Sequence, residues 1–298
     1  MRMAHGELRR KLGTISDWLH LDAKVFAVTQ YAVWVPEDID ISVPSSARVY
    51  DYMLGGAHNF AVDRAMGQKL LEIDPGYRDL TRIARATLGR IVRYMVSNGI
   101  RQFLDIGSGI PTVYNVHEIA QGIDPSCRVV YVDRDPIAVA HSQLMLQDNP
   151  AAAMVSSDMR EPERILNAPE TQRLIDFDQP VGLLFMLMLH WLTDDDDPVR
   201  MTEFYRSKLA PGSFMGVTHV GTEHDEVTDA ALATIKNNTG GEFITERTRE
   251  QVAAMFGEFQ LVEPGLVGCG EWRPGGPGDI ASAADLNQII YAGVGRKP

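Results

Sequence analysis

A regular alternation of strand-like and helix-like segments along the middle of the chain constrains its fold most strongly. Five apolar runs with strand character are separated by stretches with helical periodicity. The runs are residues 102–106, 128–132, 153–155, 181–189 and 213–220. This rhythm is typical of a parallel sheet that is covered by helices on both faces. The sequence therefore predicts a doubly wound α/β domain.

Start and stop signals agree with this pattern. Two helices are predicted ahead of the first strand, over residues 60–73 and 77–97, because each periodic stretch ends at a turn signal. Asp135 and Asp197 each precede a proline and predict the starts of later helices. A capping box at 248–251 predicts another helix start.

Both ends of the chain differ from this regular middle. Two late strand-like runs, 259–267 and 287–294, flank a Gly/Pro-rich stretch and are expected to close the sheet as an antiparallel edge. Near the N-terminus, apolar residues at helical spacing over residues 8–19 predict an amphipathic helix. We expect a helical arm and linker over residues 1–43 and the main domain over residues 44–298.

Composition limits the classes of partner. Forty acidic and 28 basic side chains give a formal net charge of −12, which would repel a phosphate backbone. The best apolar run, 181–189, is too short to span a bilayer, and the N-terminus lacks the apolar core of a signal peptide. Two cysteines without C-x-x-C spacing indicate neither a disulfide framework nor a thiolate zinc site. We expect a cytoplasmic protein that binds no nucleic acid and no membrane.

The clearest functional signal is the segment 104–112, Leu-Asp-Ile-Gly-Ser-Gly-Ile-Pro-Thr, where the first predicted strand gives way to a helix. Gly107 and Gly109 let the backbone approach a ligand at the carboxyl end of the strand. A dinucleotide-binding loop carries a third glycine where this chain has Thr112, so an NAD-dependent oxidoreductase is a weaker interpretation. No Lys-[Ser/Thr] pair follows, which excludes the nucleoside triphosphate loop.

Acidic residues follow the next two predicted strands. Asp133 ends the second strand, where a carboxylate can accept both hydroxyls of a ribose. Asp158 follows the third strand, within reach of an adenine amino group. The alternative is that the glycines form an unoccupied tight turn and that these acids are helix caps facing water. Strand-end acids in succession at one sheet edge favour a nucleoside site.

These motifs resemble the glycine-rich, ribose and adenine motifs of class I S-adenosylmethionine-dependent methyltransferases. The segment 48–64, Arg-Val-Tyr-Asp-Tyr-Met-Leu-Gly-Gly-Ala-His-Asn-Phe-Ala-Val-Asp-Arg, is similar to the opening signature of an S-adenosyl methyltransferase family long catalogued as a domain of unknown function. The similarity continues through residues 189–191, 209–213, 218–219 and 261–267. It covers the chain from about residue 44 to the C-terminus.

The resemblance implies a Rossmann-like fold with a seven-stranded, mostly parallel sheet, and S-adenosylmethionine as cofactor. In the family, the glycine-rich loop lies near the methionine part, and the two later acids lie at the ribose and the adenine. The cofactor-binding residues that it implies are Asp105, Gly107, Ser108, Gly109, Asp133, Arg134, Asp158 and Met159. The family does not supply the methyl acceptor.

Methyl transfer is an in-line displacement at a sulfonium, so an enzyme chiefly aligns the acceptor and, where necessary, removes its proton. His190 directly follows the fourth predicted strand and is the candidate base, with a structural, hydrogen-bonded histidine as the alternative. The acids at 194–197 point in different directions, and we expect no metal site there.

Residues 47–97 are expected to form a helical lid over the ligand. Gly55 and Gly56 supply flexible backbone, and neighbouring aromatic faces can attract a sulfonium cation. The candidate lid or substrate residues are Arg48, Tyr52, His58, Asn59 and Phe60. The alternative is an ordinary helix-loop-helix that packs on the sheet.

Two functions remain open from the sequence. The first is a methyltransferase that acts on an unidentified small molecule, as the nucleoside motifs and the acidic charge suggest. The second is a non-catalytic S-adenosylmethionine sensor or partner-binding protein, because the sequence contains no unambiguous base and predicts an additional N-terminal helix.

Overall fold

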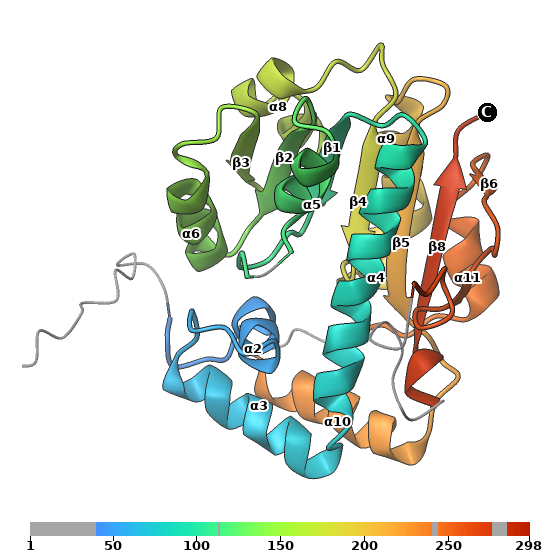
Figure 1. Ribbon diagram of the computed structural model, residues 1–298. Helices are drawn as coiled ribbons and strands as arrows, with labels where there is room; N and C mark the ends of the chain where they lie inside the picture. The colour runs from blue at the N-terminus through green and yellow to red at the C-terminus, as the bar shows by residue number, and fades with distance from the viewer. Residues whose placement is uncertain (1–39, 113, 240–243, 276–284) are drawn as a thin grey trace, which may run out of the picture. The chain divides into compact units, whose positions relative to one another are not determined.

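An eight-stranded sheet forms the centre of the protein (Figure 1). The computed structural model describes residues 40–112, 114–239, 244–275 and 285–298, and residues 40–298 form one unit. The strands are β1 (Gln102–Ile106), β2 (Arg128–Asp133), β3 (Ala152–Ser156), β4 (Gly182–Met186), β5 (Phe214–Val220), β6 (Gln260–Leu261), β7 (Val267–Gly268) and β8 (Ile290–Arg296). The expected N-terminal helix lies outside the described residues.

The strand order is β3-β2-β1-β4-β5-β8-β6, and β7 also pairs with β8. Strands β1 to β5 are parallel, whereas β8 runs antiparallel to β5. The predicted α/β class and the antiparallel closure of the sheet are therefore confirmed. The order reverses between β1 and β4, and in such sheets ligands bind at the carboxyl ends of the strands beside this point.

The helices separate the parallel strands as predicted. They are α2 (Ser46–Met53), α3 (Ala61–Ile73), α4 (Tyr77–Ser97), α5 (Val116–Ile123), α6 (Pro136–Leu146), α7 (Pro162–Leu166), α8 (Pro169–Leu174), α9 (Pro198–Ser207), α10 (Glu226–Asn238) and α11 (Arg249–Ala254). Asp135 caps α6 by accepting from the N–H of Ile137, and Asp197 caps α9 by accepting from the N–H of Arg200. The predicted capping box also begins α11.

The late run 259–267 forms two short strands rather than one. The N–H of Val262 still donates to the carbonyl of Val294, but Pro264 has no N–H to continue the ladder. The chain then turns at Gly265 and rejoins β8 as β7. This split raises the strand number from the expected seven to eight.

Apolar side chains form a separate core on each face of the sheet. Phe103 contributes to the core that contains Ile91 and Met95 of α4, while its neighbour Leu104 contributes to the opposite core. Helices α2, α3 and α10 form a third, smaller apolar cluster. Figure 1 shows these three helices beyond the end of the sheet to which the β4 arrow points.

The apolar run 181–189 leaves the sheet earlier than expected. β4 ends at Met186, and Leu187 adopts a left-handed conformation with φ of 56°. Its N–H donates to the hydroxyl of Thr218 on β5 at 2.8 Å and to the carbonyl of the same residue at 3.2 Å, the last contact of this edge before the chain turns away. A 3₁₀ turn over Leu189–Trp191 follows, so His190 lies on a turn at the sheet edge.

Candidate functional site

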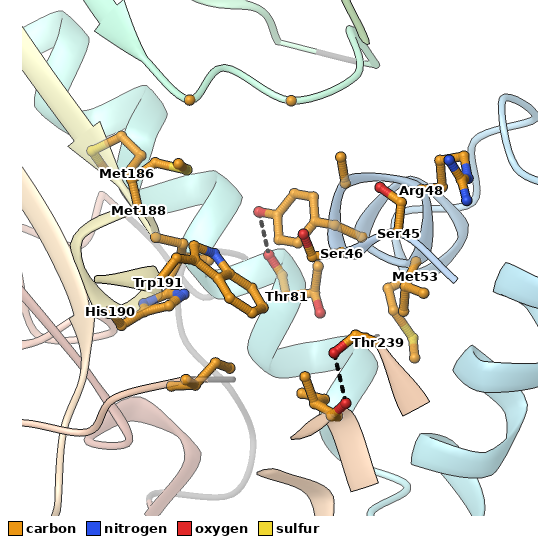
Figure 2. Close-up of a pocket in the computed structure, with 18 of the residues that line it drawn as sticks. Ser45, Ser46, Arg48, Met53, Thr81, Met186, Met188, His190, Trp191 and Thr239 are labelled. Carbon is orange, nitrogen blue, oxygen red and sulfur yellow. Dashed lines mark hydrogen bonds between the residues drawn. The ribbon is translucent and has the colours of Figure 1, made fainter. Parts of the chain in front are cut away.

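A cavity of about 730 Å³ lies at the carboxyl ends of β1, β2 and β4. It is lined by the loop after β1 with the strand-end acids, by the turn after β4, by residues of β5 and of the start of β8, and by the cover helices α2, α3, α4 and α10. A concave site at a sheet's switch point is the usual position of a small-molecule site. Figure 2 shows Met186, Met188, His190 and Trp191 on one side of this cavity and Ser45, Arg48 and Met53 on the other.

The loop after β1 depends on glycine. Gly107 and Gly109 have φ of 73° and 66°, a region that other residues rarely adopt. A Cβ at position 107 would lie 2.1 Å from the sulfur of Met188, so this position has no room for a side chain. The N–H groups of Gly107 and Ser108 donate to the carbonyl of Val132, which holds the loop against β2.

Asp133 ends β2 and lies directly beside this loop. Its Oδ2 accepts from the N–H of Gly109 at 2.7 Å, and its Oδ1 accepts from the N–H of Asp135 at 2.8 Å. Each carboxylate oxygen has a second lone pair, so both can still accept from a ligand. Burial raises the pKa of Asp133 to about 6. The pair of oxygens fits a ligand that brings two adjacent hydroxyl groups.

Asp105 is buried near the end of β1, at the base of the same loop. Burial raises its pKa to about 7; Arg85 opposes this rise and Asp133 adds to it. A buried carboxyl of this kind gains most from a positively charged partner. The hydroxyl of Ser108 is also buried, without a hydrogen-bond partner among the described residues. This end of the cavity therefore suits a ligand that carries both hydroxyl groups and a positive charge.

Asp158, after β3, has a different environment. Its Oδ1 accepts from Nε of Arg160 at 3.0 Å, and its Oδ2 accepts from Nη1 of Arg134 at 3.3 Å. Burial opposes ionisation, but the hydrogen bonds from Arg160 prevail and lower the pKa of Asp158. The residue is therefore an ionised acceptor on the cavity wall, next to Met159.

His190 lines the cavity with 2% of its surface exposed. Burial, with smaller effects from His219 and Arg247, holds its pKa well below the usual value, so the imidazole is neutral. Its Nδ1 is buried and has no hydrogen-bond partner among the described residues. The Trp191 ring lies beside it, with the two ring centroids 5.1 Å apart (Figure 2).

Arg247 holds the turn that carries His190. Its guanidinium donates to the carbonyls of Leu189 and Leu192, at 3.3 and 2.9 Å, and pairs with Asp194 at 3.0 Å. Its Nη1 also lies 3.3 Å from Nε2 of His219. The sequence contained no signal for this role, because Arg247 is more than fifty residues from the turn that it holds.

The cover is attached to the sheet through Arg48. Its Nε lies 2.8 Å from Oδ2 of Asp63, and both side chains are almost fully buried. Its Nη1 lies 3.8 Å from Asp135, which also accepts from the hydroxyl of Ser45 at 2.7 Å. Helix α2 is thereby joined to the start of α6, two residues after Asp133.

The other expected lid residues do not line the cavity. Tyr52 packs against Gly67 on α3. The Asn59 side chain donates to Asp51 at 2.7 Å, and the His58 ring lies 4.1 Å from the ring of His141. The Phe60 ring lies 5.3 Å from the Arg48 guanidinium carbon. These side chains build the cover, and Arg48 alone of the five reaches the cavity wall.

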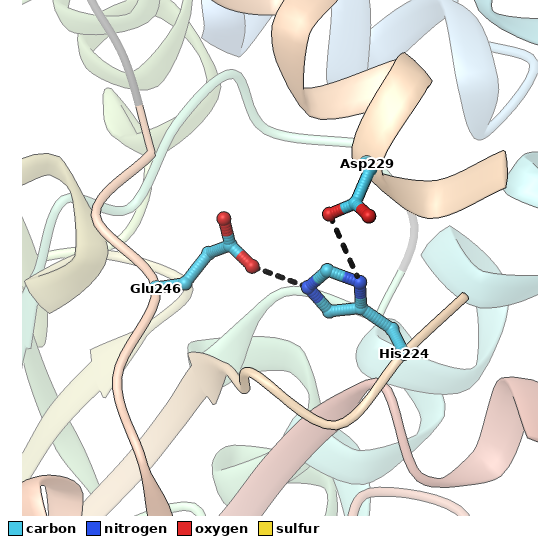
Figure 3. A group of neighbouring side chains, drawn as sticks. All are labelled: His224, Asp229 and Glu246. Carbon is cyan, nitrogen blue, oxygen red and sulfur yellow. Dashed lines mark hydrogen bonds and ion pairs between the residues drawn. The ribbon is translucent and has the colours of Figure 1, made fainter. Parts of the chain in front are cut away.

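A charged cluster lies apart from the cavity lining (Figure 3). Glu246 contacts Nε2 of His224, and Asp229 lies 3.6 Å from Nδ1. The two carboxylates face different ring nitrogens, so an ion bound through one nitrogen would require a carboxylate to move. The cluster links the start of α10 to the segment before Arg247.

The acids of the run 194–197 have separate partners. Asp194 pairs with Arg247, Asp196 lies 3.5 Å from Arg160, and Asp197 caps α9. In the described part of the chain, no helix is both long and apolar enough to cross a bilayer.

Comparison with known proteins identifies the family. The chain matches a model of the S-adenosyl methyltransferase family over residues 32–298. A crystal structure of a candidate methyltransferase from Thermobifida fusca YX is 40% identical, with a TM-score of 0.83 over 89% of this chain and 99% of that one. A DUF574 family protein from Streptomyces avermitilis MA-4680 is 33% identical, with a TM-score of 0.82 over 87% and 99% of the two chains. No curated protein matches the sequence. The chain therefore belongs to the S-adenosyl methyltransferase family, and its cofactor is S-adenosylmethionine.

Proposed function

We propose that this protein transfers the methyl group of S-adenosylmethionine to a small molecule bound in the same cavity. The observation that carries the proposal is the continuity of that cavity. The glycine loop and Asp133 line one end, and the cover helices line the other. Two ligands can therefore meet beside the turn after β4 within one cavity.

The cofactor lies along the strand ends in this proposal. The ribose hydroxyls bind Asp133, whose two oxygens keep free lone pairs. The positively charged methionine part lies near Asp105 and the loop 107–109, where the buried carboxyl favours a cation. Arg134, Asp158 and Met159 surround the adenine. When bound, S-adenosylmethionine supplies an electrophilic methyl group on a sulfonium.

The chain's own residues align the acceptor and exclude water. Residues 47–97 act as the cover, which Arg48 fastens to Asp63 and Asp135. His190 is the candidate base, and burial keeps its imidazole in the neutral form that a base requires, while the lowered pKa makes it a weak one. Alignment supplies most of the rate in a displacement of this kind, so few reacting side chains are required.

The test is transfer of a labelled methyl group. Protein, methyl-labelled S-adenosylmethionine and fractions of a small-molecule metabolite extract are incubated, and S-adenosylhomocysteine and labelled product are measured together. We expect both to appear with one class of fraction, and both to fall in Asp133→Ala when S-adenosylmethionine is below saturation. Tight binding of S-adenosylmethionine without label transfer in any fraction would instead identify a non-catalytic binding protein.

A further inference from the structure

Arginines line the cavity at three places. In the described part of the chain they are Arg48, Arg85, Arg134 and Arg160. Arg48 fastens the cover, and the last two both bind Asp158. Arg85 is close to Asp105, at the end of the cavity that the glycine loop forms.

The helical repeat of α4 directs Arg85 to the cavity. Leu80, Ala84 and Leu88 follow one another at intervals of four residues and line the cavity. Thr81 and Arg85 form the neighbouring row on the same face. Helix α4 extends from the sheet to the cover helices (Figure 1), so its cavity-facing residues pass the carboxyl ends of the strands.

Asp105 faces the same side of the sheet as α4. Alternate residues of a strand point to one face, and Phe103, two residues earlier, packs with Ile91 and Met95 of α4. Asp105 is buried and Arg85 is half-buried, and the guanidinium opposes the rise in the pKa of Asp105. A carboxyl group and a guanidinium therefore stand at one end of the cavity, close enough to interact.

Asn115 positions the guanidinium. Nη2 of Arg85 donates to Oδ1 of Asn115 at 3.2 Å. The amide nitrogen of Asn115 donates to the carbonyl of Thr112 at 3.3 Å and to Glu118 at 3.2 Å, so its oxygen is the atom that can accept from Arg85. The backbone N–H of Asn115 also donates to Glu118, at 2.8 Å. The start of α5 therefore holds Arg85 beside the segment that carries the glycine loop.

We propose that Arg85 binds the carboxylate of the methionine part of S-adenosylmethionine, while Asp105 binds its ammonium group. The inference rests on the cofactor placement in the proposed function. The two charges of an amino acid lie on groups attached to one carbon, so a guanidinium and a carboxyl group at one end of a cavity match them. A guanidinium presents five N–H donors, more than the oxygen of Asn115 can accept, and its planar fork fits both oxygens of a carboxylate. Arg85 is then a determinant of cofactor choice.

A purely structural role for Arg85 predicts a different pattern of binding. If the guanidinium only stabilised Asp105 and the start of α5, its loss would weaken every ligand of the glycine loop alike. Binding of a carboxylate predicts that only ligands with that group are weakened. Ligands that differ in the amino acid part therefore distinguish the two roles.

Three ligands with the same adenosine part test the assignment by calorimetry at neutral pH. S-adenosylhomocysteine carries both charges, S-adenosyl-3-thiopropylamine carries the ammonium alone, and 5′-deoxy-5′-methylthioadenosine carries neither. In Arg85→Met we expect S-adenosylhomocysteine to bind about 10- to 100-fold more weakly. The other two should bind no more weakly than to the unaltered protein, because neither has a carboxylate. In Asp105→Asn the two ligands with an ammonium should weaken, and the third should stay within about twofold.

Two further variants complete the test. Arg82→Met, at an exposed arginine of the same helix, is the matched control and should change none of the three affinities. Arg85→Gln repeats the test in case Arg85→Met does not fold, because its amide can still donate to Asn115. Equal weakening of all three ligands in a folded Arg85 variant, or unchanged binding of S-adenosylhomocysteine, would refute the inference. The expected binding pattern without methyl transfer to any extract fraction would refute the proposed function and leave the assignment of Arg85 standing.

Discussion

The backbone N–H of Gly109 donates a hydrogen bond of 2.7 Å to Oδ2 of Asp133. This bond joins the loop after β1 to the end of β2 across 24 residues of sequence. Asp133 also accepts from the N–H of Asp135, which in turn binds the hydroxyl of Ser45. One carboxylate therefore connects the glycine loop, the start of α6 and, through Asp135, the cover.

Removal of this carboxylate should weaken cofactor binding. Asp133→Ala is expected to cost about 1–3 kcal/mol of S-adenosylmethionine binding, because charge-assisted hydrogen bonds to the ribose are lost. Calorimetry measures the affinity directly. Asp148→Ala, at an exposed acid, is the control and should leave the affinity unchanged. An unchanged affinity in Asp133→Ala would contradict the ribose assignment.

Cofactor affinity should rise with pH. The pKa values of Asp105 and Asp133 are raised to about 7 and about 6 by burial, and a cationic ligand favours their ionised forms. Binding then releases protons, so the association constant falls as pH falls through these values, by up to about tenfold per pH unit for each group. Calorimetry from pH 5 to 8 checks this, and Asp105→Asn should remove the step nearest pH 7.

The stability of the free protein should change in the opposite direction. A carboxyl whose pKa is raised in the folded state favours folding most below its unfolded value of 3.8. That contribution is lost as pH rises through about 6 for Asp133 and about 7 for Asp105. These two groups therefore lower the free energy of unfolding as the pH rises from acidic to neutral. Denaturant titration of the unaltered protein and Asp105→Asn isolates the part that belongs to Asp105.

Gly107→Ala should impair the loop. The left-handed backbone costs an alanine about 1–2 kcal/mol, and the new Cβ would meet Met188. We expect a lower free energy of unfolding and weaker S-adenosylmethionine binding. Gly122→Ala on α5 is the control, because nothing lies within 4 Å of its Cβ and the helix favours alanine. Normal binding by Gly107→Ala would show that the loop does not need this conformation.

The ion pair beneath the cover should contribute strongly to stability. Arg48→Met leaves the buried Asp63 without its cationic partner and with only the N–H groups of Ser45 and Phe60 as donors, which is expected to cost about 3–5 kcal/mol. The exposed pair of Arg82 and Asp79 is the control, and Arg82→Met should cost about 0–1 kcal/mol. Denaturant unfolding compares the two. Equal small losses would mean that Asp63 finds another partner.

His190→Ala should affect turnover rather than cofactor binding. Loss of a general base typically lowers the rate by about 10²–10⁴, while S-adenosylmethionine affinity should stay within about twofold. Turnover is measured with the acceptor identified by label transfer, and added imidazole should restore part of it. A parallel loss of turnover and cofactor affinity, with a lower melting temperature and no rescue, would indicate a structural role.

The sequence by itself determined the fold class and the position of the motifs. Helix α4 and strand β1 have the predicted bounds, 77–97 and 102–106, because their apolar periodicity and flanking turn residues are local signals. The expected strand-end positions of the glycine loop and Asp133 follow from the same periodicity, since parallel strands end at one edge of the sheet. The roles of these residues in binding remain predictions.

Contacts between distant segments decided the rest. The left-handed Leu187, bonded to Thr218 of β5, ends β4 early and places His190 on a turn that Arg247 holds. The ion pair of Arg48 with Asp63 directs one lid residue to the cavity, and the others pack within the cover. None of these contacts has a local sequence signal, because each depends on how elements already formed pack against one another. Only the tertiary structure could therefore define the lining of the cavity.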